Sequence, residues 1–188
     1  MTATRADARR NREKLLEAAA SAFAEAGTDV SLEAVAKRAG VGIGTLYRNF
    51  PTRDALVEAV YRTEVERLTG SADELLEAHA PDVALEEWME RFVDYAVTKR
   101  GLKAALQSVA ASRSDLFANT KSDLLRALGT LLDAGAAAGT VRADVDAADV
   151  LRAMSAVWSL GEEPGWHDQA RTILRLLMDG LRHGATAR

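Results

Sequence analysis

The sequence predicts an all-helical fold, and three observations favour it. Alanine, the strongest helix former, fills 37 of the 188 positions, whereas proline, which breaks helices, occurs only three times. Apolar residues recur at intervals of three and four along most of the chain, as expected for helices with one buried face. Runs that alternate β-branched and polar residues are few, so we predict no strand.

The predicted helices are separated by residues that begin or end helices. Proline is tolerated between helices, and Pro51, Pro81 and Pro164 all lie at such boundaries. Together with the apolar spacing, these signals predict helices over residues 8–26, 31–39, 43–50, 52–70, 72–79, 83–100, 102–111, 115–138, 146–160 and 165–183.

The first two helices have clear boundary signals. The first carries Leu15, Ala19 and Phe23 on one face and ends at Gly27, a residue suited to a C-terminal cap. The second begins at Ser31, a favourable N-cap.

Residues 31–50 predict a helix-turn-helix. Gly40 can adopt the positive φ that the turn between the two helices requires. Val41 and Leu46 are apolar where the second helix must pack on the first. The helix that follows begins at Thr52, and we expect it to be the only connection between this N-terminal part and the rest of the chain.

The exposed face of the second helix suits DNA. Thr45, Tyr47, Arg48 and Asn49 form this face, and such side chains bind phosphates or base edges in a major groove. Glycine costs a helix about 1 kcal/mol relative to alanine. A close approach of a sugar–phosphate backbone would explain both Gly42 and Gly44.

The charge distribution agrees with a DNA-binding N-terminal part. The whole chain carries a net charge of −4. Residues 1–53 nevertheless contain nine basic and six acidic side chains, and the remaining residues contain 15 basic and 22 acidic ones.

Residues 9–56 resemble the N-terminal DNA-binding domain of the tetracycline-repressor (TetR) family of bacterial transcription regulators. The resemblance rests on the segments LLEAA (15–19), FAEAG (23–27), SLEAVA (31–36), AGV (39–41), GTLYRNF (44–50) and RDAL (53–56). Two positions depart from the family pattern, because Gly42 replaces a common serine and Arg53 a frequent lysine.

The resemblance implies a homodimer that binds a near-palindromic operator in double-stranded DNA, and a small-molecule effector whose binding weakens DNA affinity. It divides the chain into a helix-turn-helix domain (1–51), a connecting helix (52–70) and a ligand-binding and dimerisation domain (71–188). The residues expected to contact DNA are Arg10, Ser31, Gly42, Gly44, Thr45, Tyr47, Arg48, Asn49 and Arg53.

Large side chains in the C-terminal part are consistent with either a ligand pocket or a plain core. Aromatic residues line many small-molecule sites in helical bundles, but large side chains at helical spacing more often belong to a core. The candidate pocket residues are Trp88, Phe92, Tyr95, Gln107, Phe117 and Trp158, which would suit a hydrophobic or planar effector.

The last two predicted helices carry apolar stripes that are wider than a surface helix needs, so we expect burial against a second subunit. The alternative is that these stripes serve the core of one chain. The candidate dimerisation residues are Leu151, Met154, Val157, Ile173, Leu174, Leu177 and Leu181.

No sequence feature indicates an enzyme, a cofactor or a metal site. The chain has no cysteine, its three histidines are far apart, and nucleotide-binding, serine-hydrolase and zinc-protease motifs do not occur. No apolar run is long enough to span a membrane, and the N-terminus lacks a secretory signal, so we expect a cytoplasmic protein. The alternatives are a DNA-binding regulator without an inducer and a helical carrier or enzyme.

Overall fold

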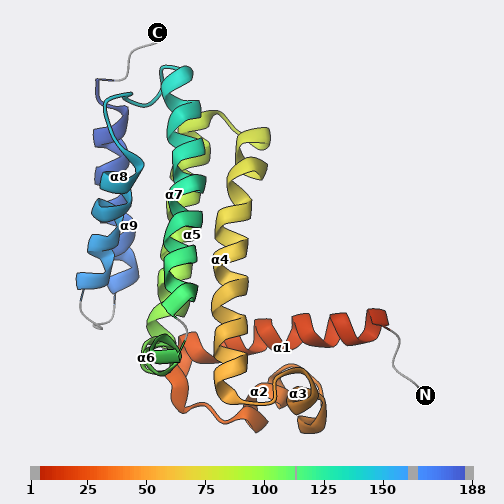
Figure 1. The fold of residues 1–188 in the computed structure, drawn as a ribbon. Helices are drawn as coiled ribbons and strands as arrows, with labels where there is room; N and C mark the ends of the chain where they lie inside the picture. Colours follow the sequence, from red (N-terminus) through yellow and green to blue (C-terminus); the bar gives the residue numbers. More distant parts are fainter. Residues whose placement is uncertain (1–4, 113, 161–164, 185–188) are drawn as a thin grey trace. The chain divides into compact units, whose positions relative to one another are not determined.

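The computed structural model describes residues 5–112, 114–160 and 165–184 and, within them, every side chain except those of residues 28, 108, 110–112, 114–116 and 118. These residues form helices joined by short turns, without a strand, which confirms the predicted all-helical fold (Figure 1). The α-helices are α1 (Arg5–Ala26), α2 (Leu32–Arg38), α3 (Ile43–Asn49), α4 (Arg53–Ala78), α5 (Pro81–Gly101), α6 (Lys103–Ser112), α7 (Ser114–Ala137), α8 (Ala147–Met154) and α9 (Trp166–Arg182). Pro51 and Pro81 lie at helix boundaries as predicted, whereas Pro164 lies outside the described residues.

The chain forms two compact units. The first contains residues 5–64 and 97–114, and the second contains residues 65–96 and 115–184. The chain passes from one unit to the other within α4, within α5 and at the start of α7. The expectation that the helix starting at Thr52 is the only connection is therefore wrong.

The first unit has a continuous apolar core. Residues from α1, α2, α3 and α4 lose all contact with solvent, namely Leu15, Ala19, Phe23, Val35, Leu46, Leu56 and Val57. The predicted stripe of α1 is therefore its buried face. Gly27, with a φ of 64°, ends α1, and a short 3-10 turn (Gly27–Asp29) leads to the cap of α2.

The prediction of separate helices over residues 52–70 and 72–79 is wrong, because α4 continues to Ala78. Val65, Leu68 and Leu75 are buried on one face of this continuous helix. Burying each such side chain stabilises the helix by about 1.5–3 kcal/mol, which outweighs the cost of about 1 kcal/mol for Gly70 within it.

The helix predicted over residues 146–160 divides into α8 and a 3-10 turn (Ser155–Ser159). Asp146 caps α8 by accepting a hydrogen bond from the Ala148 backbone at 2.7 Å. At the other end, the Ser155 hydroxyl donates to the Leu151 carbonyl oxygen at 2.7 Å, a local bond that often bends or ends helices.

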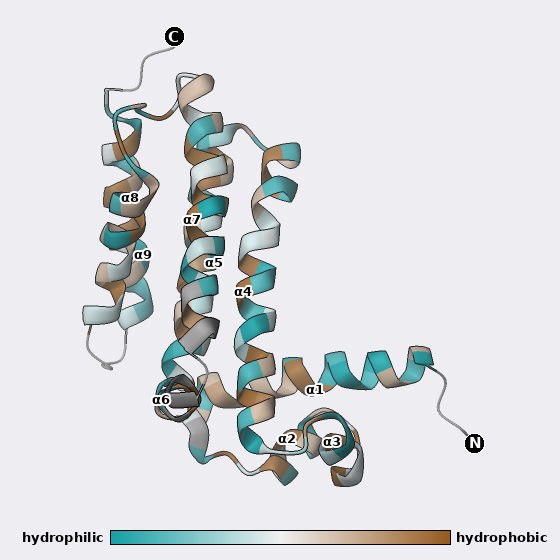
Figure 2. Ribbon diagram, viewed as in Figure 1, coloured by the Kyte–Doolittle hydropathy of each residue, from teal (hydrophilic) through white to brown (hydrophobic). Residues whose placement is uncertain are grey.

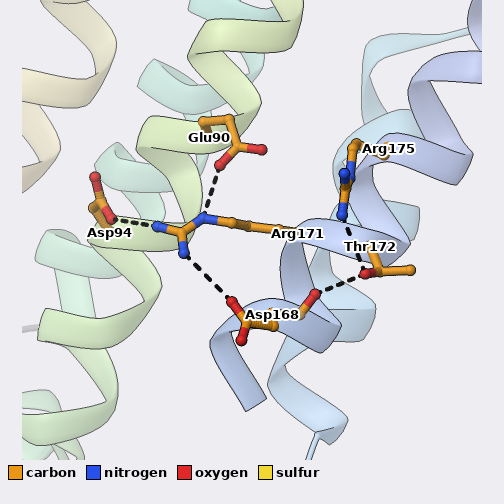
Figure 3. Close-up of polar contacts among 6 residues, drawn as sticks. All are labelled: Glu90, Asp94, Asp168, Arg171, Thr172 and Arg175. Atoms are coloured by element: carbon orange, nitrogen blue, oxygen red, sulfur yellow. Dashed lines mark hydrogen bonds and ion pairs between the residues drawn. The ribbon is translucent and has the colours of Figure 1, made fainter. Parts of the chain in front are cut away.

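Ion pairs join α5 to α9 in the second unit. Arg171 Nε lies 3.0 Å from Glu90 Oε2, and its Nη2 lies 3.9 Å from Asp94 Oδ1 (Figure 3). Near the other end of α9, Arg182 Nη2 lies 2.9 Å from Asp82 Oδ2 and 2.8 Å from an oxygen of a further α5 carboxylate. The four α5 carboxylates in these ion pairs, Asp82, Glu86, Glu90 and Asp94, recur every four residues, so they share one helix face.

Candidate nucleic-acid interface

The turn between α2 and α3 is built from local hydrogen bonds. The Ser31 hydroxyl accepts a bond from the Ala34 backbone at 3.1 Å and so confirms the predicted N-cap of α2. Gly40 has a φ of 68°, which confirms the predicted left-handed turn. The Val41 backbone N–H then donates to the Ala36 carbonyl oxygen at 3.0 Å, and α3 begins after Gly42.

Two apolar residues hold α3 in the first unit. Leu46 is completely buried, and Phe50, which follows the last residue of α3, is only 2% exposed. Leu46 within the seven-residue helix and Phe50 just after it are both turned to the core, so the opposite face of α3 is left to solvent.

Of the four side chains predicted to form the exposed face of α3, Tyr47 and Arg48 lie there, whereas Thr45 and Asn49 are half-buried. Tyr47 is 46% exposed, and Arg48 is also exposed. Arg48 Nε donates to the Gly44 carbonyl oxygen at 3.1 Å and its Nη2 donates to Thr45 Oγ1 at 3.1 Å. Asn49 Nδ2 donates to the Thr45 carbonyl oxygen at 2.8 Å. A guanidinium carries five N–H donors, so these bonds orient Arg48 while engaging only two of them.

Sequence reasoning missed Ile43, the first residue of α3. It is 37% exposed, so part of its apolar side chain faces solvent. Its spacing of four residues from Tyr47 places both on one face of the helix and was visible in the sequence. An apolar group on a recognition helix suits the methyl group of thymine.

Gly42, the N-cap of α3, and Gly44, within α3, are not required by the fold. A Cβ added to Gly42 or Gly44 would meet no atom within 4 Å, and neither residue has a positive φ. The absence of a side chain at these positions therefore leaves room for something outside the chain.

Two predicted DNA contacts outside α3, Arg53 and Arg10, also bond to protein groups. Arg53 Nη2 donates to the Val30 carbonyl oxygen at 2.7 Å, and Arg10 forms an ion pair with Asp7. Their role in DNA binding stays a prediction.

A polar cluster joins α2 to α1 beside this interface. Arg38 Nη2 donates to Glu25 Oε2 at 2.6 Å, and Arg38 Nη1 donates to Ser21 Oγ at 3.2 Å. The Ser21 hydroxyl in turn donates to Glu25 Oε1 at 3.0 Å. Hydrogen bonds from Arg38 and then from Ser21 lower the pKa of Glu25, since both favour the ionised carboxylate.

The second unit brings four of the six candidate pocket residues together. The ring centroids of Phe92 and Tyr95 are 5.8 Å apart, and each lies 6.2 Å from the ring of Trp158. Trp88 lies 6.4 Å from Phe92, and its Nε1 donates to the Leu68 carbonyl oxygen at 2.9 Å.

The two remaining candidates lie on other helices. Gln107 is exposed on α6 in the first unit, and Phe117 is half-buried on α7 in the second. The part of the candidate pocket that the structure brings together is therefore an aromatic cluster of Trp88, Phe92, Tyr95 and Trp158.

The predicted dimerisation stripe is largely buried within one chain. The fully or almost fully buried members are Leu151, Met154, Val157, Leu174 and Leu181. Ile173 and Leu177 are half-buried, and Leu176, which was not predicted, is 67% exposed. The apolar surface that α9 presents to solvent thus centres on Leu176.

Two further features are absent from the described residues. No cluster of three or more potential metal ligands occurs there. None of these helices combines the length and apolar character needed to cross a membrane.

A helix-turn-helix with a polar, partly basic exposed helix, followed by a helical second unit, is the architecture of a bacterial DNA-binding regulator. The family description "Bacterial regulatory proteins, tetR family" matches residues 15–60, and "Transcriptional regulator SbtR-like, C-terminal domain" matches residues 80–183. The chain belongs to the TetR family of transcriptional regulators, and the resemblance noted in its sequence is confirmed. The family consists of regulators and not of enzymes, which agrees with the expected lack of catalytic function.

Solved structures of TetR regulators resemble the chain over most of its length. The TetR transcriptional regulator SCO0520 from Streptomyces coelicolor is 45% identical, with a TM-score of 0.85 over 93% of this chain and 99% of that one. A TetR regulatory protein from Mycobacterium vanbaalenii is 39% identical, with a TM-score of 0.78 over 95% and 98% of the two chains. An HTH-type transcriptional regulator of Staphylococcus aureus (strain USA300) is 30% identical over 114 residues, which are 60% of each protein.

Proposed function

We propose that the protein is a cytoplasmic, homodimeric repressor that binds a near-palindromic operator through α3 and leaves it when a small hydrophobic or aromatic effector binds to the second unit. The observation that carries the DNA-binding part is the exposed face of α3, where Arg48 and Asn49 are oriented by bonds to their own helix. Side chains that are ordered before binding lose less entropy when they bind.

The glycines of α3 provide the sharpest test of this interface. Substitution Gly44→Ala should stabilise the free protein by about 1 kcal/mol, because alanine favours the helix and the added methyl group meets no protein atom. The same methyl group should weaken operator binding if the sugar–phosphate backbone lies against Gly44. Thermal unfolding and fluorescence anisotropy on one preparation measure both effects, and unchanged operator affinity would contradict the proposed approach.

Arg48 tests the direct contacts. Substitution Arg48→Ala should cost about 1–3 kcal/mol of operator affinity. An exposed arginine on a different helix, Arg126→Ala on α7, serves as the control for the loss of one positive charge. Equal affinities of the two variants would contradict the assignment of α3 as the helix that contacts the operator.

The dimer proposal is supported by the exposed apolar surface of α9. Ile173, Leu176 and Leu177 are near one another on that helix, and Leu176 is the most exposed large apolar residue in the described part of the chain. Substitution Leu176→Glu should shift sedimentation from dimer to monomer, whereas Arg175→Glu beside it should shift it less. An unchanged dimer in the Leu176→Glu variant would contradict this surface.

The effector proposal is supported by the aromatic cluster, in which Trp158 is half-buried while its neighbours are closed off from solvent. An aromatic ligand that stacks on Trp158 should quench its emission, raise the unfolding temperature and lower operator affinity. In a Trp158→Phe variant the quenching should disappear.

A regulator without a small-molecule inducer is the second candidate. Trp88, Phe92 and Tyr95 are at most 2% exposed, which is typical of core residues. If no compound in a broad screen changes both thermal stability and operator affinity, this second function is favoured.

A further inference from the structure

The first turns of α1 extend beyond the core of the first unit. The first buried residue of α1 is Leu15, and residues 5–14 are exposed or half-buried. These ten positions span about 15 Å at the rise of an α-helix. Figure 2 shows this part of α1 mostly in hydrophilic colours, and apolar colours appear where the helix reaches the core. A helical segment with little tertiary packing is only marginally stable in water, which favours a role for it in binding a partner.

Arginine side chains continue the buried face of α1 into this segment. Leu16, Ala19 and Phe23 lie on the buried face at spacings of three and four residues. The same spacing carried toward the N-terminus reaches Arg12, Arg9 and Arg5. We call these three residues the arginine stripe. The face of α1 that is apolar inside the core is therefore basic outside it.

Arg12 shows where the arginine stripe lies relative to α3. Its guanidinium carbon is 4.7 Å from the centre of the Phe50 ring, the residue that caps the C-terminal end of α3. The stripe thus begins beside the helix that carries the proposed DNA contacts, and Arg5 lies about 10 Å further along α1. Each nucleotide of one strand advances along the DNA axis by about 3.4 Å, so a distance of about 10 Å along that axis corresponds to about three nucleotides.

Arg9, in the middle of the arginine stripe, is open to solvent, since its side chain is 78% exposed. Asp7 pairs with Arg10, which is not on the stripe. Glu13 Oε1 lies 3.6 Å from Arg9 Nε, but both side chains are more than half exposed, and such surface pairs are weak.

We propose that Arg5 and Arg9 bind phosphates of duplex DNA that flanks the base pairs contacted by α3. The proposal rests on the proposed function, because it extends the same interface. It assigns these contacts to residues that the sequence analysis did not select, and it predicts that DNA outside the operator contributes to affinity without contributing sequence preference.

The test compares the salt dependence of DNA binding by the full chain and two variants. The double variant Arg5→Gln/Arg9→Gln removes the proposed contacts, and Lys14→Gln removes one charge from the opposite face of the same helix. The DNA is the operator duplex selected by the unmodified protein, once with flanking DNA and once ending at the last selected base pair. Each lost phosphate contact should reduce the log–log salt slope by about 0.9, which is about 3.5-fold in affinity between 50 and 200 mM salt.

For the double variant we expect a reduced slope and weaker binding to the long duplex, little change on the short one, and the same preferred sequence. Lys14→Gln should behave as the unmodified protein does. The variant Arg5→Lys/Arg9→Lys keeps the positive charges and should therefore retain the salt slope of the unmodified protein. Circular dichroism of all variants records the helix content, so that an effect of lost charge is distinguished from an effect of lost helix.

Three results would overturn the proposal. They are an unchanged slope in the double variant, an equal reduction in Lys14→Gln, and a loss that is the same on the long and short duplexes. In each case Arg48→Ala still binds the operator poorly if the proposed function holds. If the unmodified protein selects no duplex, the proposed function itself has failed.

Discussion

The close approach of α5 to α1 makes Gly101 the least replaceable glycine of the first unit. A Cβ at Gly101 would lie 2.1 Å from the carbonyl oxygen of Phe23 and 2.8 Å from its carbonyl carbon. Both are backbone atoms, so no side-chain rotation relieves the clash. The substitution Gly101→Ala requires one helix to shift by about 1 Å before ordinary van der Waals contact is restored.

The expected magnitude follows from two opposing effects. Overpacking costs about 1–3 kcal/mol, and a clash with backbone belongs at the upper end. The gain in helix propensity from glycine to alanine returns about 1 kcal/mol. We therefore expect Gly101→Ala to lose about 2 kcal/mol of unfolding free energy.

Gly129→Ala is the matched control on α7. A Cβ at Gly129 would meet no atom within 4 Å, so we expect a gain of about 1 kcal/mol. When urea unfolding is followed by circular dichroism, the signal reports the unfolding of both units. Trp88 and Trp158 lie in the second unit, so tryptophan emission reports the unfolding of that unit. A Gly101→Ala variant that is as stable as the unmodified protein, or more stable, would refute the packing argument.

Three further predictions concern individual contacts. In Arg38→Met, the pKa of Glu25 should rise toward its ordinary value of 4.5, as an NMR titration would measure, because Arg38 is the main cause of its lowered pKa. Because the pKa of Glu25 is lower in the folded state, its contact with Arg38 stabilises the protein at pH values above the ordinary pKa. This stabilisation is lost as the pH falls through the pKa of the folded state. The unmodified protein should therefore lose more stability on acidification than the Arg38→Met variant. Trp88→Phe should lower the free energy of unfolding by about 1–3 kcal/mol, since it removes a buried hydrogen bond to the Leu68 carbonyl oxygen and leaves a small cavity. Urea unfolding measures this loss, and a smaller loss in a variant with unchanged packing would count against the contribution of that bond. Arg182→Met should lower the free energy of unfolding by about 1 kcal/mol at low salt and by less at high salt, because the two carboxylates that Arg182 pairs with on α5 are partly exposed. A loss of stability that does not depend on salt would contradict an electrostatic origin.

Features set by local chemistry could be predicted from the sequence. The cap at Ser31, the left-handed turn at Gly40 and the cap at Thr52, whose hydroxyl accepts a bond from the Ala55 backbone at 3.1 Å, all depend on neighbouring residues. The buried stripe of α1 depends only on helical periodicity. These are the elements that form the helix-turn-helix, and this explains why the class of protein was visible before its structure.

Features set by packing between distant segments could not be predicted. Gly70 is a reasonable helix end until the burial of residues on both sides of it is known, and the packing keeps α4 continuous. Asp82, Glu86, Glu90 and Asp94 of α5 could have been recognised as one face from their spacing of four, but their partners on α9 lie far along the chain, as Arg171 does at 81 positions from Glu90. The same limit applies to the arginine stripe, since only the contact of Arg12 with Phe50 relates it to α3.

The dimerisation stripe illustrates a different limit. Leu174 and Leu177 have the same residue type and lie on the same helix, yet Leu174 is 2% exposed and Leu177 is half-buried. A stripe in the sequence records that a face is apolar but not whether its own chain or a partner covers it.

Selection of bound duplexes from a random DNA library, at two salt concentrations, tests the central claim most directly. The account predicts a near-palindromic site whose half-sites are separated by about one turn of B-DNA, or a multiple of it, with binding that weakens steeply as salt increases. Recovery of no preferred sequence at low salt, from protein shown by mass spectrometry to carry no bound small molecule, would contradict it.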